Sequence, residues 1–183
     1  DLSPQERRRN RLHFGLVFQD FNLFPQYTAL ENVTLARRLL AKSERTGETP
    51  EAIRREGEAL LEQMNVGSAK DRMPAEVSGG EAQRAAIART MINEPGIIFA
   101  DEPTGALNKR NTGEVLDLLT ELNKEGQSIL MVTHDLRAAV RGTRLLYLED
   151  GKILDELSMP VFHPEDERTR EAAINDWLAS FQW

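Results

Sequence analysis

The chain has 183 residues, of which 40% are hydrophobic and 29% charged, the composition of a globular domain with its own core. Its formal net charge of -7 disfavours a general nucleic-acid-binding role, and the basic stretch at 6–11 is interpreted as a solvated face. The absence of cysteine excludes a disulfide framework and a thiolate metal site, and fits a reducing cytoplasm. The longest apolar runs are of strand length and too short to span a bilayer, so any association with a membrane would be peripheral.

The first predicted element is a strand at 13–18, which is followed by a long helical and charged segment. Within that segment two amphipathic helices are predicted at 29–42 and 49–64, separated by a polar loop. Thr49 is the expected N-cap of the second helix, and Pro50 occupies its first turn. We therefore expect a helical subdomain inserted between the first strand and the rest of a sheet.

Two further strands are predicted at 96–100 and 128–133. Both are apolar throughout, as strands buried in a parallel sheet tend to be. The residues between them, 108–126, have apolar side chains at helical spacing and end in Gly126, the expected C-cap. This strand–helix–strand unit predicts an α/β fold with a mainly parallel sheet.

The rest of the chain is predicted to hold a hairpin and a closing helix. The Asp-Gly pair at 150–151 is a strong turn signal between two short strands. Residues 159–167 are interpreted as a linker. The helix expected at 168–183 would bury Trp177 and Leu178.

Two adjacent carboxylates, Asp101 and Glu102, end the strand at 96–100. The carboxyl edge of a parallel sheet is where α/β folds bind ligands. Neighbouring acids repel each other, so a metal ion or a catalytic task is the natural reason to keep them there. In P-loop NTPases, an Asp at this place holds Mg²⁺ and a following Glu acts as general base on the attacking water. The alternative is a strand end followed by a solvated turn.

Polar side chains also follow the other two predicted strands. His134 comes one strand–helix unit after the two acids, so it can contact a γ-phosphate from the same edge. Gln19 follows the first strand, and its carbonyl oxygen can ligate Mg²⁺ or orient water. Taken singly, each has a simpler alternative: a satisfied histidine at a strand end, and a surface glutamine.

The stretch VSGGEAQR at 77–84 opens a helix with two glycines, which are poor helix formers. Ser78 and Glu81 fit a capping box, in which each side chain bonds the other residue's backbone N–H. The capping box does not explain Gly79 and Gly80. Bare backbone at a helix N-terminus suits a phosphate, because free N–H groups and the helix dipole then face it unobstructed.

In this order, the motifs resemble the ATP-binding cassette of ABC transporters over nearly the whole chain. Gln19 is similar to the Q-loop glutamine and VSGGEAQR to the signature motif. IIFADEP (97–103) is similar to the Walker B motif, GALN (105–108) to the D-loop and His134 to the switch histidine. Five motifs in one order are far more specific than any one alone.

The resemblance implies a P-loop NTPase (RecA-like) core that binds ATP and Mg²⁺. It assigns catalysis to Glu102 and His134, and the metal to Asp101 and Gln19. The residues implied to contact nucleotide are Gln19, Ser78, Gly79, Gly80 and Glu81. The residues implied to lie in a dimer interface are Ala106, Leu107 and Asn108.

The resemblance also implies partners and a location. Cassettes work as head-to-tail dimers, so a second cassette is one expected partner, and a transmembrane permease that docks near 20–35 is the other; nucleic acid is not expected. Residues 21–33 and PTGALN (103–108) are similar to the group of lipoprotein-release and macrolide- or peptide-export ATPases. The expected location is cytoplasmic, peripheral on the inner face of the cell membrane.

The sequence departs from the family pattern at several positions. Val77 replaces the usual Leu of the signature, Glu81 its usual Gln, and Asn108 the usual Asp of the D-loop. A Glu81 carboxylate near a γ-phosphate would repel it unless it folds back into its capping box. No G-x-x-x-x-G-K-S/T is present, and the sole Gly-Lys pair is at 151–152.

We therefore expect that the N-terminal P-loop part is missing and that the 183-residue chain alone is inactive. The predicted division is a partial core at 1–25, a helical subdomain at 26–92, the remaining core at 93–158 and a C-terminal linker and helix at 159–183. Alternatives to a transport ATPase are a soluble ABC ATPase and a non-enzymatic remnant without a P-loop.

Overall fold

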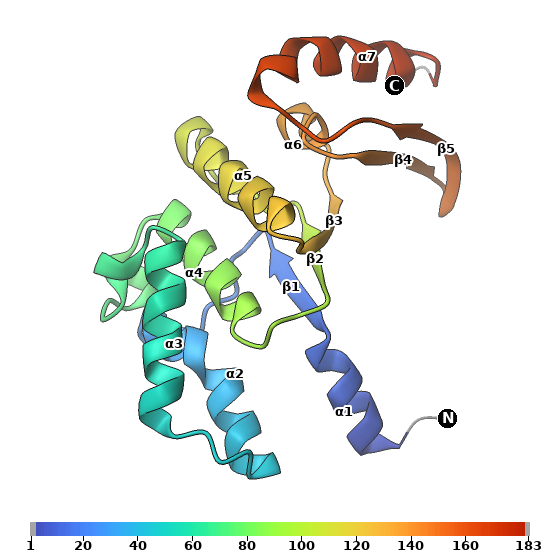
Figure 1. Cartoon of the computed structure of the whole chain (residues 1–183). Helices are drawn as coiled ribbons and strands as arrows, with labels where there is room; N and C mark the ends of the chain where they lie inside the picture. Colours follow the sequence, from blue (N-terminus) through green and yellow to red (C-terminus); the bar gives the residue numbers. More distant parts are fainter. Residues whose placement is uncertain (1–2, 182–183) are drawn as a thin grey trace. The chain divides into compact units, whose positions relative to one another are not determined.

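The computed structural model describes residues 3–181, apart from the side chains of residues 4, 5, 8 and 9. The chain forms two compact units, one ending at Val132 and the other beginning at Thr133 (Figure 1). No helix in the described part of the chain is long and apolar enough to cross a membrane.

The first unit contains a three-stranded parallel sheet in the order β1 (Phe14–Phe18), β2 (Ile97–Asp101) and β3 (Ser128–Val132). The register pairs Phe18 with Asp101 and Asp101 with Val132, so the three strands end side by side. The predicted strands and their parallel arrangement are confirmed. The residues that follow each strand therefore emerge along one edge of the sheet.

Helical segments make both crossovers between these strands. The elements between β1 and β2 are α2 (Ala29–Glu44), α3 (Pro50–Gln63), the short 3-10 helices η1 (Gly67–Ala69) and η2 (Pro74–Glu76), and α4 (Gly79–Met91). The crossover from β2 to β3 is α5 (Lys109–Lys124). As predicted, Thr49 caps α3 by accepting a hydrogen bond from the Ala52 N–H at 3.2 Å, with Pro50 at its first position. Gly126 follows α5 in a left-handed conformation, with φ of 102°.

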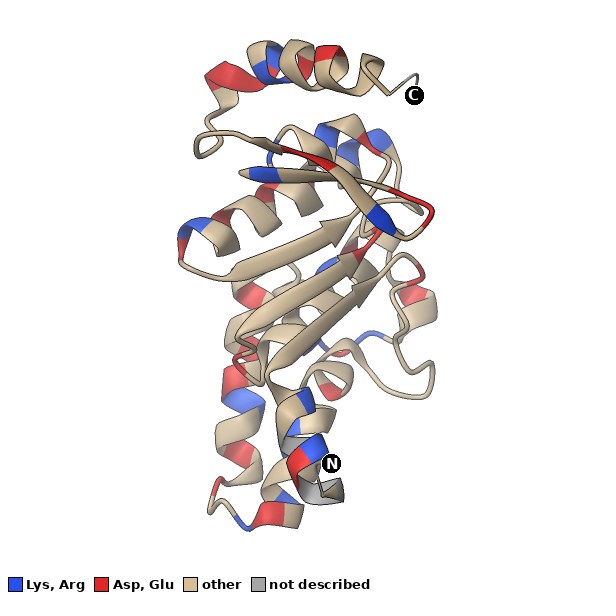
Figure 2. Ribbon diagram, turned by 90° about the vertical axis from the view of Figure 1, so that its right-hand side faces the viewer, with Lys and Arg blue, Asp and Glu red and all other residues tan. Residues whose placement is uncertain are grey.

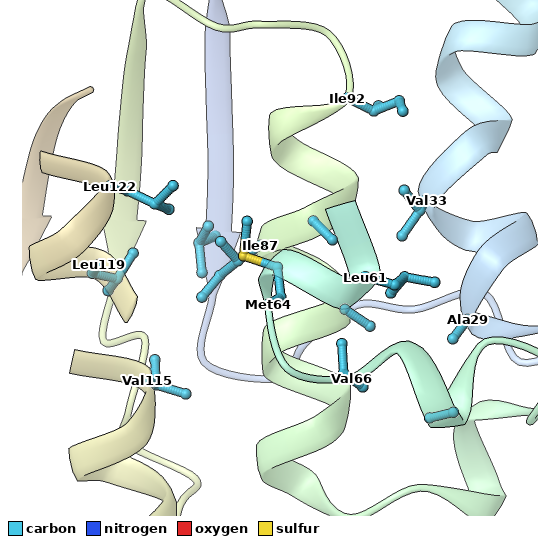
Figure 3. Packing of buried hydrophobic residues seen from close by; sticks show 14 of the residues in the cluster. Ala29, Val33, Leu61, Met64, Val66, Ile87, Ile92, Val115, Leu119 and Leu122 are labelled. Carbon is cyan, nitrogen blue, oxygen red and sulfur yellow. The ribbon is translucent and has the colours of Figure 1, made fainter. Parts of the chain in front are cut away.

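The core of this unit is centred on α4, which packs between the sheet and the other helices. Figure 3 shows Val115, Leu119 and Leu122 of α5 on one side of α4, and Ala29 and Val33 of α2 on the other. Small side chains dominate the buried face of α4, which lets its backbone approach the strands closely. The buried residues of α4 are Gly80, Ala82, Gln83, Ala85, Ala86, Ile87, Ala88 and Thr90.

The helices cover only one face of the sheet. Successive right-handed crossovers along one strand order place their helices on the same side, which is where α4 and α5 lie. The opposite face is apolar and open: Leu16 is 50% exposed, Leu130 45% and Val132 59%. The predicted burial is therefore wrong for β3, whose Leu130 and Val132 are exposed, but it fits β2, whose residues 97–100 are buried or half-buried. Figure 2 shows charged residues over the helices, whereas these strands are free of them until Asp101.

A first helix, α1 (Pro4–Leu12), precedes the sheet and was not predicted. It begins with a capping box between Ser3 and Glu6, with Pro4 at its first position. These are ordinary signals for the start of a helix. The helix was not predicted because the three arginines at 7–9 leave it without an apolar periodicity. The first strand consequently begins at Phe14.

The second unit contains the short helix α6 (Leu136–Ala139), the antiparallel hairpin β4 (Arg144–Glu149) and β5 (Lys152–Ser158), the 3-10 helix η3 (Pro164–Asp166) and α7 (Glu167–Ala179). The hairpin turn is confirmed: Asp150 and Gly151 both have positive φ, 48° and 74°. This is the backbone conformation that a two-residue turn of type I′ requires.

The closing helix α7 buries different residues from those predicted. Ile174 and Arg170 are the buried members, whereas Trp177 and Leu178 are half-buried. The Trp177 indole keeps an exposed edge because its N–H donates to Asp155 at 2.9 Å. The Arg170 guanidinium is tolerated inside because it donates to the carbonyls of residues 140, 142 and 160.

Candidate functional site

The carboxyl edge of the three-stranded sheet gathers three of the predicted site residues. Gln19 follows β1, Asp101 ends β2 and Glu102 follows it, and the register places Phe18 beside Asp101. Asp101 is exposed and Glu102 is half-buried. The prediction that these side chains belong to one edge is confirmed.

Glu102 has an unusual backbone conformation. Its φ is 45°, in the left-handed region that non-glycine residues rarely adopt. Two hydrogen bonds hold it there: its N–H donates to the Val132 carbonyl at 2.9 Å, and its own carbonyl accepts from the Gly105 N–H at 3.0 Å. Such outliers concentrate at functional sites, where the surrounding structure sustains the strain. The conformation turns the chain sharply away from β2 at Glu102.

Gln19 lies against the turn that follows Glu102. A methyl group on Gly105 would lie 3.0 Å from Cδ and 3.2 Å from Nε2 of Gln19. A side chain at residue 105 would therefore displace the exposed Gln19 amide by a few tenths of an ångström. Contact between the Gln19 side chain and the 102–105 turn brings the predicted metal ligand and the predicted base into one neighbourhood.

The chain just after Gln19 is fastened to α4. Phe21 and Asn22 both have positive φ, 57° and 49°, and the Arg89 guanidinium donates to both of their carbonyls, to Phe21 at 3.0 Å. These charge-assisted hydrogen bonds offset the conformational cost of two consecutive left-handed residues. Arg89 could not be identified from the sequence, because a positive charge in a helix carries no signal of a distant backbone partner.

The capping box at the start of α4 is confirmed. The Ser78 hydroxyl accepts from the Glu81 N–H at 3.3 Å, while the Glu81 carboxylate accepts from the Ser78 N–H at 2.8 Å and from its hydroxyl at 2.7 Å. Arg72 lies 3.8 Å from the same carboxylate. The hydrogen bonds from Ser78, aided by the Arg72 and Arg84 charges, lower the pKa of Glu81 below its ordinary value of 4.5. The negative charge is thus folded back onto the cap.

The two glycines of this segment have a packing role as well. Gly80 is buried, and a methyl group there would lie 2.6 Å from Cγ of Asn111 on α5. At Gly79 the methyl group would lie 3.3 Å from the Phe21 ring and 3.4 Å from Leu107. Packing against Asn111 is therefore a second reason for glycine at position 80, beside the phosphate interpretation. Phosphate binding stays a prediction for Gly80 and for the half-buried Gly79, where the contacts are tight but not prohibitive.

Changing Glu81 to Gln tests whether this carboxylate faces a phosphate. A Gln amide oxygen can still accept from Ser78, so we expect a stability change below about 1 kcal/mol at neutral pH. Because the folded pKa of Glu81 is lowered, its contribution to stability is full above about pH 4.5 and is lost as the pH falls through the folded value. Thermal melts across this range should therefore show less acid sensitivity in the variant.

In the whole protein we expect Glu81→Gln to change ATP hydrolysis by less than about 3-fold, since the charge is already engaged by its cap. An increase of about 10-fold or more would contradict this, because it would mean that the carboxylate repels the phosphate.

The loop at 105–108, predicted to lie in a dimer interface, also has local roles. Asn108 caps α5, its side chain accepting from the Asn111 N–H at 3.0 Å. Leu107 is half-buried against the core, and Ala106 is exposed. Asn and Asp cap helices equally well, so the departure at Asn108 is compatible with the fold. The interface role of these residues stays a prediction.

His134 belongs to the second unit, where it is exposed and lies just before α6. Asp135 caps that helix, its carboxylate accepting from the Arg137 N–H at 2.9 Å, and its own N–H donates to Thr133 Oγ1 at 3.0 Å. The Arg137 guanidinium, and to a smaller extent His134, lower the pKa of Asp135. These contacts order the segment around His134. A catalytic role for His134 beside Glu102 stays a prediction.

The donor chemistry at the sheet edge fits a magnesium ion. Asp101 offers a carboxylate and Gln19 an amide oxygen, and Mg²⁺ prefers one or two such protein ligands completed by water and substrate phosphates. No group of three or more His, Asp or Glu side chains in residues 3–181 could hold a metal ion by itself. The edge is suited to a metal that arrives with a nucleotide.

This parallel sheet with strand-end acids, and a helical segment inserted after its first strand, defines the class as an ATP-binding cassette with the P-loop NTPase fold. Residues 1–105 match the family model described as ABC transporter, and the chain belongs to that family. The predicted family, fold and ATP-binding class are thereby confirmed.

Individual relatives agree with this assignment. The chain is 45% identical to the uncharacterized ABC transporter ATP-binding protein YbbA of Escherichia coli K12, over 79% of this chain and 61% of YbbA. It is 43% identical to the lipoprotein-releasing system ATP-binding protein LolD of Aquifex aeolicus, over 82% of this chain and 64% of LolD. The predicted likeness to the lipoprotein-release group is thus confirmed. The chain spans less than two thirds of the length of either relative.

A solved structure gives the same result for the fold. The ATP-binding cassette MJ0796, a dimer in a post-hydrolysis state bound to ADP and Pi, matches with a TM-score of 0.75 and 38% identity, over 88% of this chain and 70% of that one.

Proposed function

We propose that the chain is the nucleotide-binding part of a transport ATPase that hydrolyses ATP in a head-to-tail dimer of cassettes. The observation that carries this proposal is the grouping of Gln19, Asp101 and Glu102 at one sheet edge, in a chain that also holds the signature helix α4. The alternative of a decayed remnant is disfavoured, because the chain keeps both Glu102 and His134, which a decayed site has no reason to retain.

In the proposed mechanism Glu102 accepts the proton of the attacking water, and His134 contacts the γ-phosphate. Asp101 and Gln19 would hold Mg²⁺, which would supply positive charge to neutralise the phosphates. The Gln19 amide lies against the 102–105 turn, beside Gly105. These roles assign proton transfer and metal binding to Glu102, Asp101 and Gln19 at one sheet edge, and the phosphate contact to His134.

The helix α4 contributes the other half of a composite site. First-turn N–H groups of a helix have no partner within it, and they attract phosphate together with the helix dipole. The described chain has no phosphate-binding loop of its own: of its Gly-Lys pair, Gly151 lies in the β4–β5 turn and Lys152 begins β5. We propose that Ser78, Gly79 and Gly80 close on a nucleotide bound by a second cassette. The dimer of MJ0796 supports this arrangement.

A membrane permease is the proposed second partner, with export as the direction. The names of LolD and of the macrolide export protein MacB, 42% identical over 84% of this chain, support this choice. The docking segment near 20–35 is ordered by Asn32, which accepts from the Phe24 N–H at 2.7 Å and donates to the carbonyls of Phe24 and Tyr27. Phe24 itself is 45% exposed. The proposed location is the inner face of the cell membrane.

Comparing the 183-residue polypeptide with the whole protein tests this function. The shorter polypeptide should show no ATP turnover above background, because it has no G-x-x-x-x-G-K-S/T segment to hold the phosphates. The whole protein should release phosphate from MgATP at a rate in the ordinary enzyme range, about 1 per second or faster. Turnover by the 183-residue polypeptide alone would overturn the composite site, and an inactive whole protein would overturn the assigned activity.

A further inference from the structure

Gln83 is a polar side chain with no exposed surface, on the buried face of α4. Its neighbours along this face are apolar, among them Ala82 and Ala86. Burying an amide is unfavourable unless its N–H groups find acceptors, so a glutamine here requires a reason. None of the catalytic or binding roles proposed for this chain involves Gln83.

The Gln83 amide bridges the ends of two strands. Its Nε2 donates to the Phe18 carbonyl at 3.0 Å and to the Pro103 carbonyl at 2.5 Å. Phe18 directly precedes Gln19, and Pro103 directly follows Glu102. Since an amide nitrogen has two hydrogens and both acceptors are carbonyls, the orientation of the amide is fixed.

We infer that Gln83 is a positioning residue for hydrolysis, which holds Gln19 and Glu102 at their working separation and ties both to the signature helix. This inference rests on the proposed function. The side chain comes from α4, whose first turn carries Ser78 and Gly79, so one amide connects the three parts of the site within this unit. Small displacements of reacting groups lower rates strongly, so a supporting hydrogen bond of this kind affects turnover more than binding.

Thr90 provides a matched control on the same helix. Its single hydroxyl hydrogen is shared between the Leu16 carbonyl and the Ala86 carbonyl, each at 3.0 Å, and the side chain is 9% exposed. Leu16 lies inside the strand ladder, where it pairs with Phe99, two residues before Phe18. Losing this bond weakens the same contact between α4 and β1 without reaching the strand ends.

The test measures kcat and KM for MgATP, together with the thermal midpoint, in Gln83→Met and Thr90→Val variants of the whole protein. Met keeps the length of the side chain and Val the shape, and each variant removes the donor. We expect Gln83→Met to lower kcat by about 10-fold or more with KM within about 3-fold, and Thr90→Val to leave kcat within about 2-fold. Equal effects on kcat, or a loss of kcat that follows the thermal midpoint in both variants, would overturn the inference.

A second variant keeps the inference testable if Gln83→Met does not fold. In Gln83→Glu the buried carboxyl group can donate to a carbonyl only when it is protonated, and burial favours the protonated form. Its kcat relative to the parent should therefore rise as the pH falls from about 8.5 to about 6. A constant ratio contradicts a positioning role. A parent protein without turnover would instead contradict the proposed function, and this inference with it.

Discussion

Replacing Glu102 by Gln in the whole protein is expected to abolish most ATP hydrolysis while ATP still binds. The amide has the size of the carboxylate but cannot accept a proton from water, and loss of a general base lowers kcat by about 10²–10⁴-fold. The fold should be preserved, because Glu and Gln meet the left-handed backbone at φ of 45° with similar ease. The measurement is phosphate release at saturating MgATP, with nucleotide binding followed by equilibrium titration.

The matched control for this change is Glu94→Gln, at the opposite end of strand β2. Glu94 is exposed and lies just before β2, whereas Glu102 lies just after it. It also has a positive φ, of 49°, so both variants test an acid in a left-handed turn. Only the change at Glu102 should lower kcat. Hydrolysis at the parental rate in the Glu102 variant would show that another group is the base.

The second large effect is expected at Gly79, the first residue of α4. An aspartate there would face the phosphate of the partner cassette, and two negative charges about 4 Å apart repel by about 4 kcal/mol at an effective dielectric constant of about 20. We therefore expect Gly79→Asp to weaken ATP-driven association and to lower hydrolysis by about 10²–10³-fold. The fold should tolerate the change, because a carboxylate in the first turn favours the helix dipole.

Two substitutions at the same position separate charge from size. Gly79→Asn has the shape of the aspartate without its charge, and Gly79→Ala adds only the methyl group that would lie 3.3 Å from the Phe21 ring. Both should keep much more activity than Gly79→Asp. If Asp and Asn reduce hydrolysis equally, crowding against Phe21 and Leu107 explains the glycine, and the phosphate interpretation fails.

Local signals in the sequence were sufficient for most of the architecture. The strands, the Thr49 and Ser78 caps and the turn at 150–151 depend on residues within about four positions of one another, where propensity and capping chemistry act directly. The common edge of Gln19, Asp101 and Glu102 followed from one further rule, that parallel strands present their carboxyl ends together.

Contacts between distant segments could not be read in the same way. Gln83 meets Phe18, 65 residues away along the chain, and Arg89 meets Phe21, 68 residues away. The fit of Gly80 against Asn111 depends on how α4 and α5 pack, which no local pattern specifies. The exposed face of the sheet was unexpected for a related reason. An apolar strand indicates burial, but the strand alone does not show which other segments cover each of its two faces.

The most direct test of the composite site is the mass of the whole protein in solution, measured by light scattering with and without MgATP. The Glu102→Gln variant should be monomeric without nucleotide and dimeric with MgATP, because binding closes the dimer while hydrolysis cannot reopen it. Adding Gly79→Asp to this variant should return it to a monomer with ATP still bound. A Glu102→Gln protein that binds MgATP yet remains monomeric would contradict the claim that α4 closes on the phosphate of a partner.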